Sequence, residues 1–230
     1  LLESRGLGDV YKRQDEYKYI QLSDTKKELS DEIFSKIERS HYLRKISRDN
    51  FNLKFFEAII NKIDENKNLL LDDEVQFYIN KSEQINNKDF NIELAYDLIN
   101  LYFKRLVDFS NFQIKLIEEN QFDFLKDEYL DIFYEDNVWQ TNLSDLQSES
   151  SSSQPNNDLI KRYQNRIRRI NQQKEEDVFS LVMNVLTNQF DPHSSYLSPR
   201  SAEDFELNMS LKLSGIGALL GVEDLSLIHI

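Results

Sequence analysis

The chain has 230 residues, of which 41 are acidic and 28 are basic, so its formal net charge is −13 at neutral pH. This excess of negative charge disfavours nucleic acid and anionic membranes as partners, because phosphates need cationic side chains to neutralise them. The chain contains no cysteine, which excludes disulfides and thiolate metal sites. No apolar run approaches the ~20 residues that cross a bilayer.

The two ends resemble foreign sequence. Ser4 to Gln14 reads like the translation of a transposase-type sequencing adapter, and residues 225–230 read like the same inverted repeat translated from the other strand. The alternative is an ordinary frayed terminus and a short apolar tail. We expect residues 1–14 and 225–230 to be artefacts. The sequence gives no information on a targeting signal upstream of Asp15.

Glycine and proline are absent from Asp15 to Gln154. A stretch of this length without a chain-breaking residue, rich in Leu, Ile, Lys, Glu and Asn, is typical of consecutive helices. We therefore expect a mainly α fold, with a helical domain over residues 15–190.

Apolar residues recur along this domain at helical spacing. In chain order, Ser30 followed by Asp31 and Glu32 indicates a helix start. Further apolar stripes follow at steps of three and four residues, over 55–63, 92–107 and 178–186. A cofactor or ligand groove is the alternative interpretation of these aromatic stripes, but core packing explains them more simply.

A polar, Ser-rich segment interrupts the domain at residues 148–158. It cannot bury enough apolar surface to offset the entropy of ordering, so we expect a loop there. We expect a helix to resume near Leu159, and this helix is locally basic. Salt bridges to acidic helices explain its basic residues more simply than nucleic-acid binding does. Its arginines are Arg162, Arg166, Arg168 and Arg169.

The composition changes at Asp191. Two prolines and several turn formers predict a linker over 191–208, in which a short amphipathic piece ends near Leu207. The alternation of Met209–Leu213 then predicts a strand, residues 214–218 a glycine-rich turn, and residues 218–222 a second strand. A β-containing domain is therefore expected to begin at residue 209 and to run to residue 224.

The linker contains the residue types of a serine-protease triad, namely Asp191, His193, Ser194 and Ser195. A triad requires its side chains to converge, whereas neighbours in an extended, proline-containing loop point in different directions. We expect Asp191 to brace the turn and His193 to pack or to bond to the backbone. His41 and His193 are isolated, so neither a metal nor a cofactor is expected.

The run from Asn188 to Arg200, Asn-Gln-Phe-Asp-Pro-His-Ser-Ser-Tyr-Leu-Ser-Pro-Arg, closely resembles the tail-specific (carboxy-terminal processing) serine protease family. The register continues through Met209-Ser210-Leu211 and Gly215-Ile216-Gly217-Ala218. In that family such a run joins a helical N-terminal domain to a PDZ domain. Ser194 stands where threonine is usual. The resemblance is dense over 160–222 and implies a structural linker made by Asp191, Pro192, His193, Tyr196 and Pro199.

The resemblance implies that the turn after the linker binds the carboxylate of a substrate's C-terminal tail. PDZ domains hold such a tail as an added strand, with its carboxylate in a nest of backbone N–H groups. Glycine lets the backbone approach the anion without a Cβ in the way. A plain β-turn without a ligand is the alternative. The residues concerned are Gly215, Ile216, Gly217 and Ala218.

The family uses a serine nucleophile with a neutral lysine as its base, and both lie beyond the PDZ domain. The resemblance therefore places no catalytic residue in this chain. It implies a periplasmic endopeptidase that degrades or processes tailed proteins, possible membrane tethering, and a possible helical adaptor lipoprotein as partner. Two other classes stay open: a helical and PDZ scaffold that binds C-termini without cutting, and a helical interaction domain whose glycine turn has no ligand.

Overall fold

The structure is a computed structural model that describes residues 17–41, 50–85, 90–119, 156–210, 220–223 and 226–229. The chain divides into two compact units, Leu1–Ser195 and Tyr196–Ile230. The first is built from helices, and the second contains one described helix and a pair of short strands. The fold is mainly α, as the sequence predicts.

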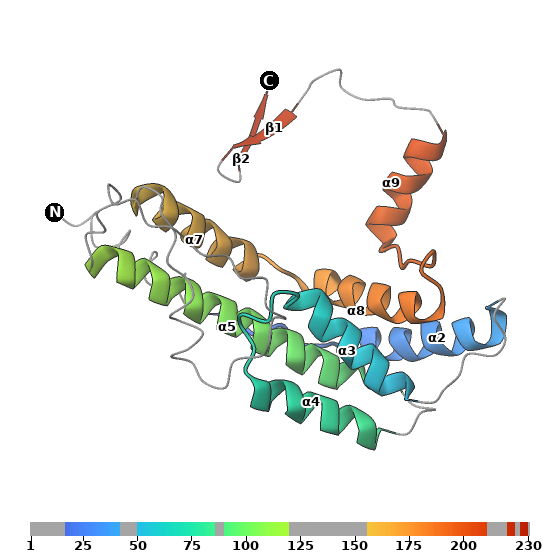
Figure 1. Cartoon of the computed structure of the whole chain (residues 1–230). Coiled ribbons are helices and arrows are strands. Elements are labelled where there is room, and N and C mark those ends of the chain that lie inside the picture. The colour runs from blue at the N-terminus through green and yellow to red at the C-terminus, as the bar shows by residue number, and fades with distance from the viewer. Residues whose placement is uncertain are drawn as a thin grey trace. The chain divides into compact units, whose positions relative to one another are not determined.

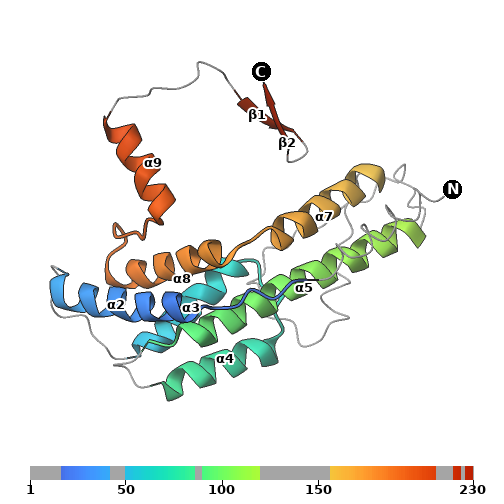
Figure 2. The same cartoon turned by 180° about the vertical axis from the view of Figure 1, so that it is seen from behind.

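The first unit is arranged around the 28-residue helix α5 (Figures 1 and 2). One half of α5 packs in a bundle with α2, α3 and α8, and α4 packs on α3, whereas the other half pairs with α7. The helices of this unit are α2 (Asp24–Ser40), α3 (Phe51–Ile63), α4 (Asp72–Gln84), α5 (Ile92–Glu119), α7 (Asn156–Asn171) and α8 (Glu175–Phe190).

The apolar stripes of the sequence form the core. On α3, Phe55, Phe56 and Ile59 are fully buried, and Tyr96 and Leu98 of α5 and Phe179 of α8 are buried against the same interior. Phe55 meets Phe56 edge to face at a ring-centroid distance of 5.4 Å. Since these rings fill one another's gaps within the bundle, the core interpretation of the aromatic stripes is confirmed, and no groove is needed to explain them.

The expected helix start at Ser30 is wrong. The helix α2 begins seven residues earlier, with Ser23 as its cap, whose Oγ accepts from the N–H of Lys26 at 3.4 Å. Ser30 is fully buried inside α2 and donates its hydroxyl to the carbonyl of Lys27. Ser23 with Asp24 offers the same cap and first-turn acid as Ser30 with Asp31, so the local pattern alone could not decide between them.

The helix α7 begins at Asn156, close to the predicted restart at Leu159. Ile167 and Ile170 bury their side chains with Val107 of α5. None of the ion pairs between described residues involves this basic helix, so the predicted salt bridges to described acidic helices are not formed. Arg166 instead lies over the ring of Tyr163, 5.4 Å from its centroid.

In the second unit, the helix α9 (Pro199–Ser210) covers most of the expected linker and corrects the predicted strand, since Met209 and Ser210 are helical. Ser198 caps α9 by accepting from the N–H of Ser201 at 3.2 Å, and Pro199 at the first position has the backbone angle a helix needs. Phe205 and Met209 are four residues apart, which suits a helix as well as alternation suits a strand. Residues 211–213 lie outside the described residues.

The strands β1 (Leu220–Glu223) and β2 (Ser226–His229) pair antiparallel, with Leu220 opposite His229 and Glu223 opposite Ser226. The strand predicted over 218–222 therefore agrees with β1 from Leu220 onward. The strand β2 falls in the segment that resembles adapter sequence.

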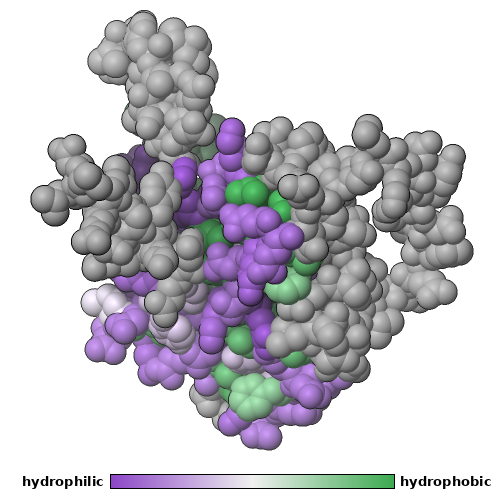
Figure 3. All heavy atoms as spheres, turned by 90° about the vertical axis from the view of Figure 1, so that its left-hand side faces the viewer, coloured by the Kyte–Doolittle hydropathy of each residue, from purple (hydrophilic) through white to green (hydrophobic). Residues whose placement is uncertain are grey.

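Among the described helices, none combines the length and apolarity needed to cross a membrane. On the face shown in Figure 3, the described residues are mostly hydrophilic, and hydrophobic side chains appear in small separate patches. The predicted Ser-rich loop at 148–158 falls mainly outside the described residues, apart from the start of α7.

Candidate functional site

The predicted carboxylate loop at Gly215, Ile216, Gly217 and Ala218 lies outside the described residues. The candidate site that the structure does describe is the connecting segment that precedes this loop in the sequence, together with the helical unit that holds it. The connecting segment begins at the end of α8 and continues into the turn that follows.

The turn after α8 is braced by its own aspartate. The N–H of Asp191 donates to the carbonyl of Thr187 at 3.1 Å, which closes the last turn of α8. The Oδ1 of Asp191 then accepts from the N–H of His193 at 2.9 Å, and the Asp191 carbonyl accepts from the N–H of Ser194 at 2.9 Å. This carboxylate is therefore bonded within the turn, and no nucleophilic triad is assembled there.

Phe190, the last residue of α8, fixes this turn to the helical core. Its ring is 6.1 Å from that of Phe34 on α2 and 5.7 Å from that of Phe51 on α3, measured between centroids. The ring of His41, at the end of α2, lies 6.0 Å from it. Phe190 itself is buried. The connecting segment therefore begins at a well-packed point where α2, α3 and α8 meet.

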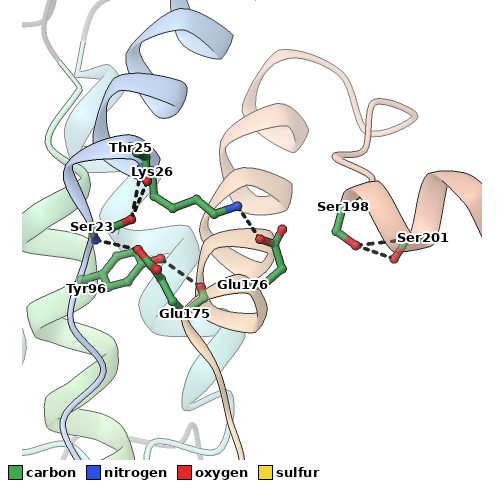
Figure 4. A network of polar contacts seen from close by, with 8 residues as sticks. All are labelled: Ser23, Thr25, Lys26, Tyr96, Glu175, Glu176, Ser198 and Ser201. Carbon is green, nitrogen blue, oxygen red and sulfur yellow. Dashed lines mark hydrogen bonds and ion pairs between the residues drawn. The ribbon is translucent and has the colours of Figure 1, made fainter.

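A polar network joins the starts of α2 and α8 (Figure 4). The N–H of Ser23 donates to Oε1 of Glu175 at 2.6 Å, and the Lys26 ammonium pairs with the Glu176 carboxylate. The same ammonium lies over the Phe179 ring, 4.5 Å from its centroid. These contacts join segments about 150 residues apart in sequence, so they set the position of α8 and of the turn at its end.

The segment before α2 is held by one asparagine of α5. Asn100, which is buried, accepts from the N–H of Ile20 at 2.8 Å and donates to the Ile20 carbonyl at 3.0 Å. The hydroxyl of Tyr17 also donates to Asn100. The Asn100 amide reproduces the hydrogen bonds of a neighbouring strand, so an extended segment is fixed along a helix.

Tyr17, Tyr19, Tyr78 and Tyr102 stay protonated at neutral pH. Burial raises the pKa of Tyr17, Tyr78 and Tyr102 to about 12. Burial and then a hydrogen bond to Asp97 raise the pKa of Tyr19 to about 12. These phenols are therefore hydrogen-bond donors at neutral pH, and none is poised as a nucleophile or a base.

A cavity of about 170 Å³ lies between the starts of α2 and α5. Its charged lining is partly satisfied internally, because the Lys27 ammonium pairs with Glu93 and Asp97 accepts from the hydroxyl of Tyr19. Glu93 also raises the pKa of Lys27, so that amine stays cationic. The cavity therefore offers no neutral amine and no nucleophile. Its lining is Tyr19, Leu22, Ser23, Asp24, Lys27, Glu93, Tyr96 and Asp97.

Within the described ranges, no group of histidine, aspartate and glutamate side chains is placed to hold a metal ion. The residues that hold the helices before the connecting segment, such as Asn100 and Glu175, have no local sequence signal. Each forms hydrogen bonds with a backbone group far away in the sequence. Ser23 and Phe190 carry recognisable local signals, a cap and an apolar stripe, but nothing in the sequence indicates which elements they meet.

Comparison with known proteins identifies the helical unit. The family described as "Tail specific protease N-terminal domain" matches residues 33–152 and 143–200. A curated protein of Haemophilus influenzae named "Tail-specific protease" is 28% identical over 211 residues, which cover 83% of this chain and 30% of that protein. The chain thus spans about 30% of the length of that relative.

Proposed function

The chain belongs to the tail-specific protease family through its N-terminal domain, and from this membership we propose that it is the front part of a periplasmic serine endopeptidase that recognises the C-terminal tails of its protein substrates. The observation that carries the proposal is the family match, which runs through the turn after α8 and ends at Arg200. The similar protein from Haemophilus influenzae carries the activity in its name.

In this proposal the helical unit is the base from which the chain continues into a tail-binding domain. Phe190 fixes the end of α8 between α2 and α3, and Asp191 closes the turn that follows. The segment that continues toward the tail-binding domain therefore starts from a buried residue of the helical unit.

In this proposal the tail is captured by Gly215, Ile216, Gly217 and Ala218, acting as the carboxylate loop of a PDZ domain. The backbone N–H groups of this loop bind the anion, and Ile216 borders the pocket for the last side chain. The strand β1 starts at Leu220, two residues after these four. Cleavage is performed by a serine and a neutral lysine encoded beyond Asp224. A helical adaptor lipoprotein would dock on the helical unit.

The alternative is a non-enzymatic scaffold that binds protein C-termini. It shares every feature of the described residues and differs only in lacking the serine and lysine. Extending the reading frame past residue 224 and assaying the longer protein separates the two.

The experiment uses the extended protein and a folded substrate that carries an unstructured apolar C-terminal tail. A matched substrate ends in two aspartates instead. We expect the apolar-tailed substrate to disappear and the acidic-tailed one to persist, both measured by gel densitometry. Binding of the apolar tail without any loss of substrate supports the scaffold and contradicts the protease, and equal loss of both substrates contradicts recognition of the tail.

A further inference from the structure

The exposed apolar side chains of the described residues gather in one segment. Six large hydrophobic residues are exposed, and four of them lie between Leu197 and Met209. On α9, Phe205 is 53% exposed, Leu207 55% and Met209 68%. No residue of α9 is buried. Soluble proteins rarely leave a cluster of this kind uncovered unless it is an interaction surface.

The apolar residues of α9 lie on two sides of the helix. At about 100° per residue, Met209 lies about 40° from Phe205, with Ala202 beside them, whereas Leu207 lies about 160° from Met209. A helix with one apolar stripe suits a single contact, and one that is hydrophobic all round suits a buried position. The helix α9 lies between these cases, since Leu207 is a separate apolar residue opposite the stripe. The pattern therefore indicates cover on both sides of α9.

The helix α9 is also too short to be stable uncovered. It has 12 residues, and isolated helices below about 12–15 residues are marginal in water. Its cap at Ser198 contributes only about 1 kcal/mol. Most of the stability of such a helix comes from packing, and two short paired strands do not supply a core.

The charge of α9 decides against a lipid surface as its cover. Glu203, Asp204 and Glu206 outweigh Arg200, and interfacial helices that bind anionic lipid carry the opposite excess on their polar face. A cover made of protein is therefore favoured.

Two boundaries fall near the start of α9 and indicate which part of the protein covers it. The helical unit ends at Ser195, and the match to the family's N-terminal domain ends at Arg200. The helix α9 thus falls in the same unit as β1 and β2, and all but its first two residues lie outside the domain that the family match defines.

We infer that α9 is the first element of the tail-binding domain and is enclosed by that domain when its chain is complete, with Phe205 and Met209 on one side and Leu207 on the other. This inference rests on the proposed function for the existence of that domain. It assigns α9 to the domain as a packed part, so the segment between the two domains shortens to the residues around Ser195–Ser198.

The absence of cysteine from the whole chain allows a direct test by single-cysteine labelling. Phe205→Cys, Leu207→Cys and Met209→Cys are made both in the 230-residue chain and in the protein extended past residue 224. Asn208→Cys is the matched control, because Asn208 is exposed and lies between the test positions. The rate of alkylation by iodoacetamide is measured for each variant.

We expect fast alkylation at all four positions in the 230-residue chain. In the extended protein, alkylation at 205, 207 and 209 slows by about tenfold or more, while position 208 stays fast. Unchanged rates at the three apolar positions overturn the inference. Slowing that appears in the shorter chain only at high protein concentration shows that a second copy covers α9, which also overturns it.

Amide hydrogen exchange of the unsubstituted extended protein provides a second measurement that does not depend on the variants folding. We expect the amides of Phe205–Met209 to exchange more slowly there than in the shorter chain. Neither measurement needs proteolysis or a free carboxylate. If α9 is protected but the protein does not recognise tails, the proposed function alone is refuted. If the protein is an active protease but α9 is not protected, this inference alone is refuted.

Discussion

Asn100 and Ile20 exchange two hydrogen bonds across 80 residues of sequence, one in each direction, at 2.8 and 3.0 Å. The side chain of α5 thereby pairs with the backbone of the segment before α2 as a strand would. The N-terminal part of the described chain is consequently part of the bundle that supports α8 and its turn.

Replacing Asn100 with alanine should destabilise the helical unit by about 2–4 kcal/mol, because the N–H and C=O of Ile20 lose their partners in a buried place. Chemical denaturation followed by circular dichroism measures the loss. Asn61→Ala, at an exposed position on α3, is the control and should cost less than about 0.5 kcal/mol. Equal losses for the two variants would show that the bonds to Ile20 contribute little.

Asp64 organises the loop between α3 and α4. Its buried carboxylate accepts from the backbone N–H groups of Asn68, Leu69 and Leu70 at 3.1, 3.0 and 2.9 Å. Asp64→Ala leaves these donors unpaired and should cost about 2–4 kcal/mol in unfolding free energy. The neighbouring Glu65 is exposed, so Glu65→Ala should leave the denaturation midpoint unchanged. A stable Asp64→Ala protein would mean that water replaces the carboxylate.

Phe190 should matter for stability as well as for position. Phe190→Ala removes a buried ring from contact with Phe34 and Phe51, with an expected cost of about 3–4 kcal/mol. Phe77→Ala removes a ring that is 51% exposed on α4 and should cost less than about 1 kcal/mol. Thermal denaturation of the pair gives the comparison. A small effect at residue 190 would contradict its role as the anchor of the turn.

The raised pKa values of Tyr17, Tyr78 and Tyr102, which are partly or fully buried, predict a loss of stability in alkali. The folded pKa of Tyr17, Tyr78 and Tyr102 is about 12, above the ordinary value of 10.0. The folded state holds these protons more tightly than the unfolded state, so this stability is complete below pH 10 and is lost as the pH rises toward 12. Ultraviolet absorbance of tyrosinate should show late ionisation in the native protein, and Tyr102→Phe should remove part of it. Complete ionisation near pH 10 without unfolding would contradict this.

The helices that pack through a long apolar stripe could be predicted from the sequence. The stripes over 55–63, 92–107 and 178–186 correspond to α3, α5 and α8, because burial on one face imposes helical spacing on the residues themselves. The family could also be predicted, from the run at Asn188–Arg200. The strand at 209–213 could not be settled by spacing, since Phe205 and Met209 also fit a helix.

The contacts that hold the helices before the connecting segment could not be predicted. Asn100, Asp64 and Glu175 each bond to backbone groups that no sequence pattern connects with them. A buried amide or carboxylate looks like any surface residue until the fold brings its partner close. The start of α2 illustrates the same limit, because Ser23 and Ser30 carry equivalent cap signals and only packing distinguishes them.

Peptide binding to the protein extended past residue 224 measures the proposed capture of substrates by their terminal carboxylate. An apolar peptide with a free C-terminus is compared with the same peptide as its C-terminal amide, by isothermal titration calorimetry. We expect the amide to bind about 10- to 100-fold more weakly, since it loses the charge-assisted hydrogen bonds from the backbone of Gly215–Ala218. Equal affinity for the acid and the amide would contradict it.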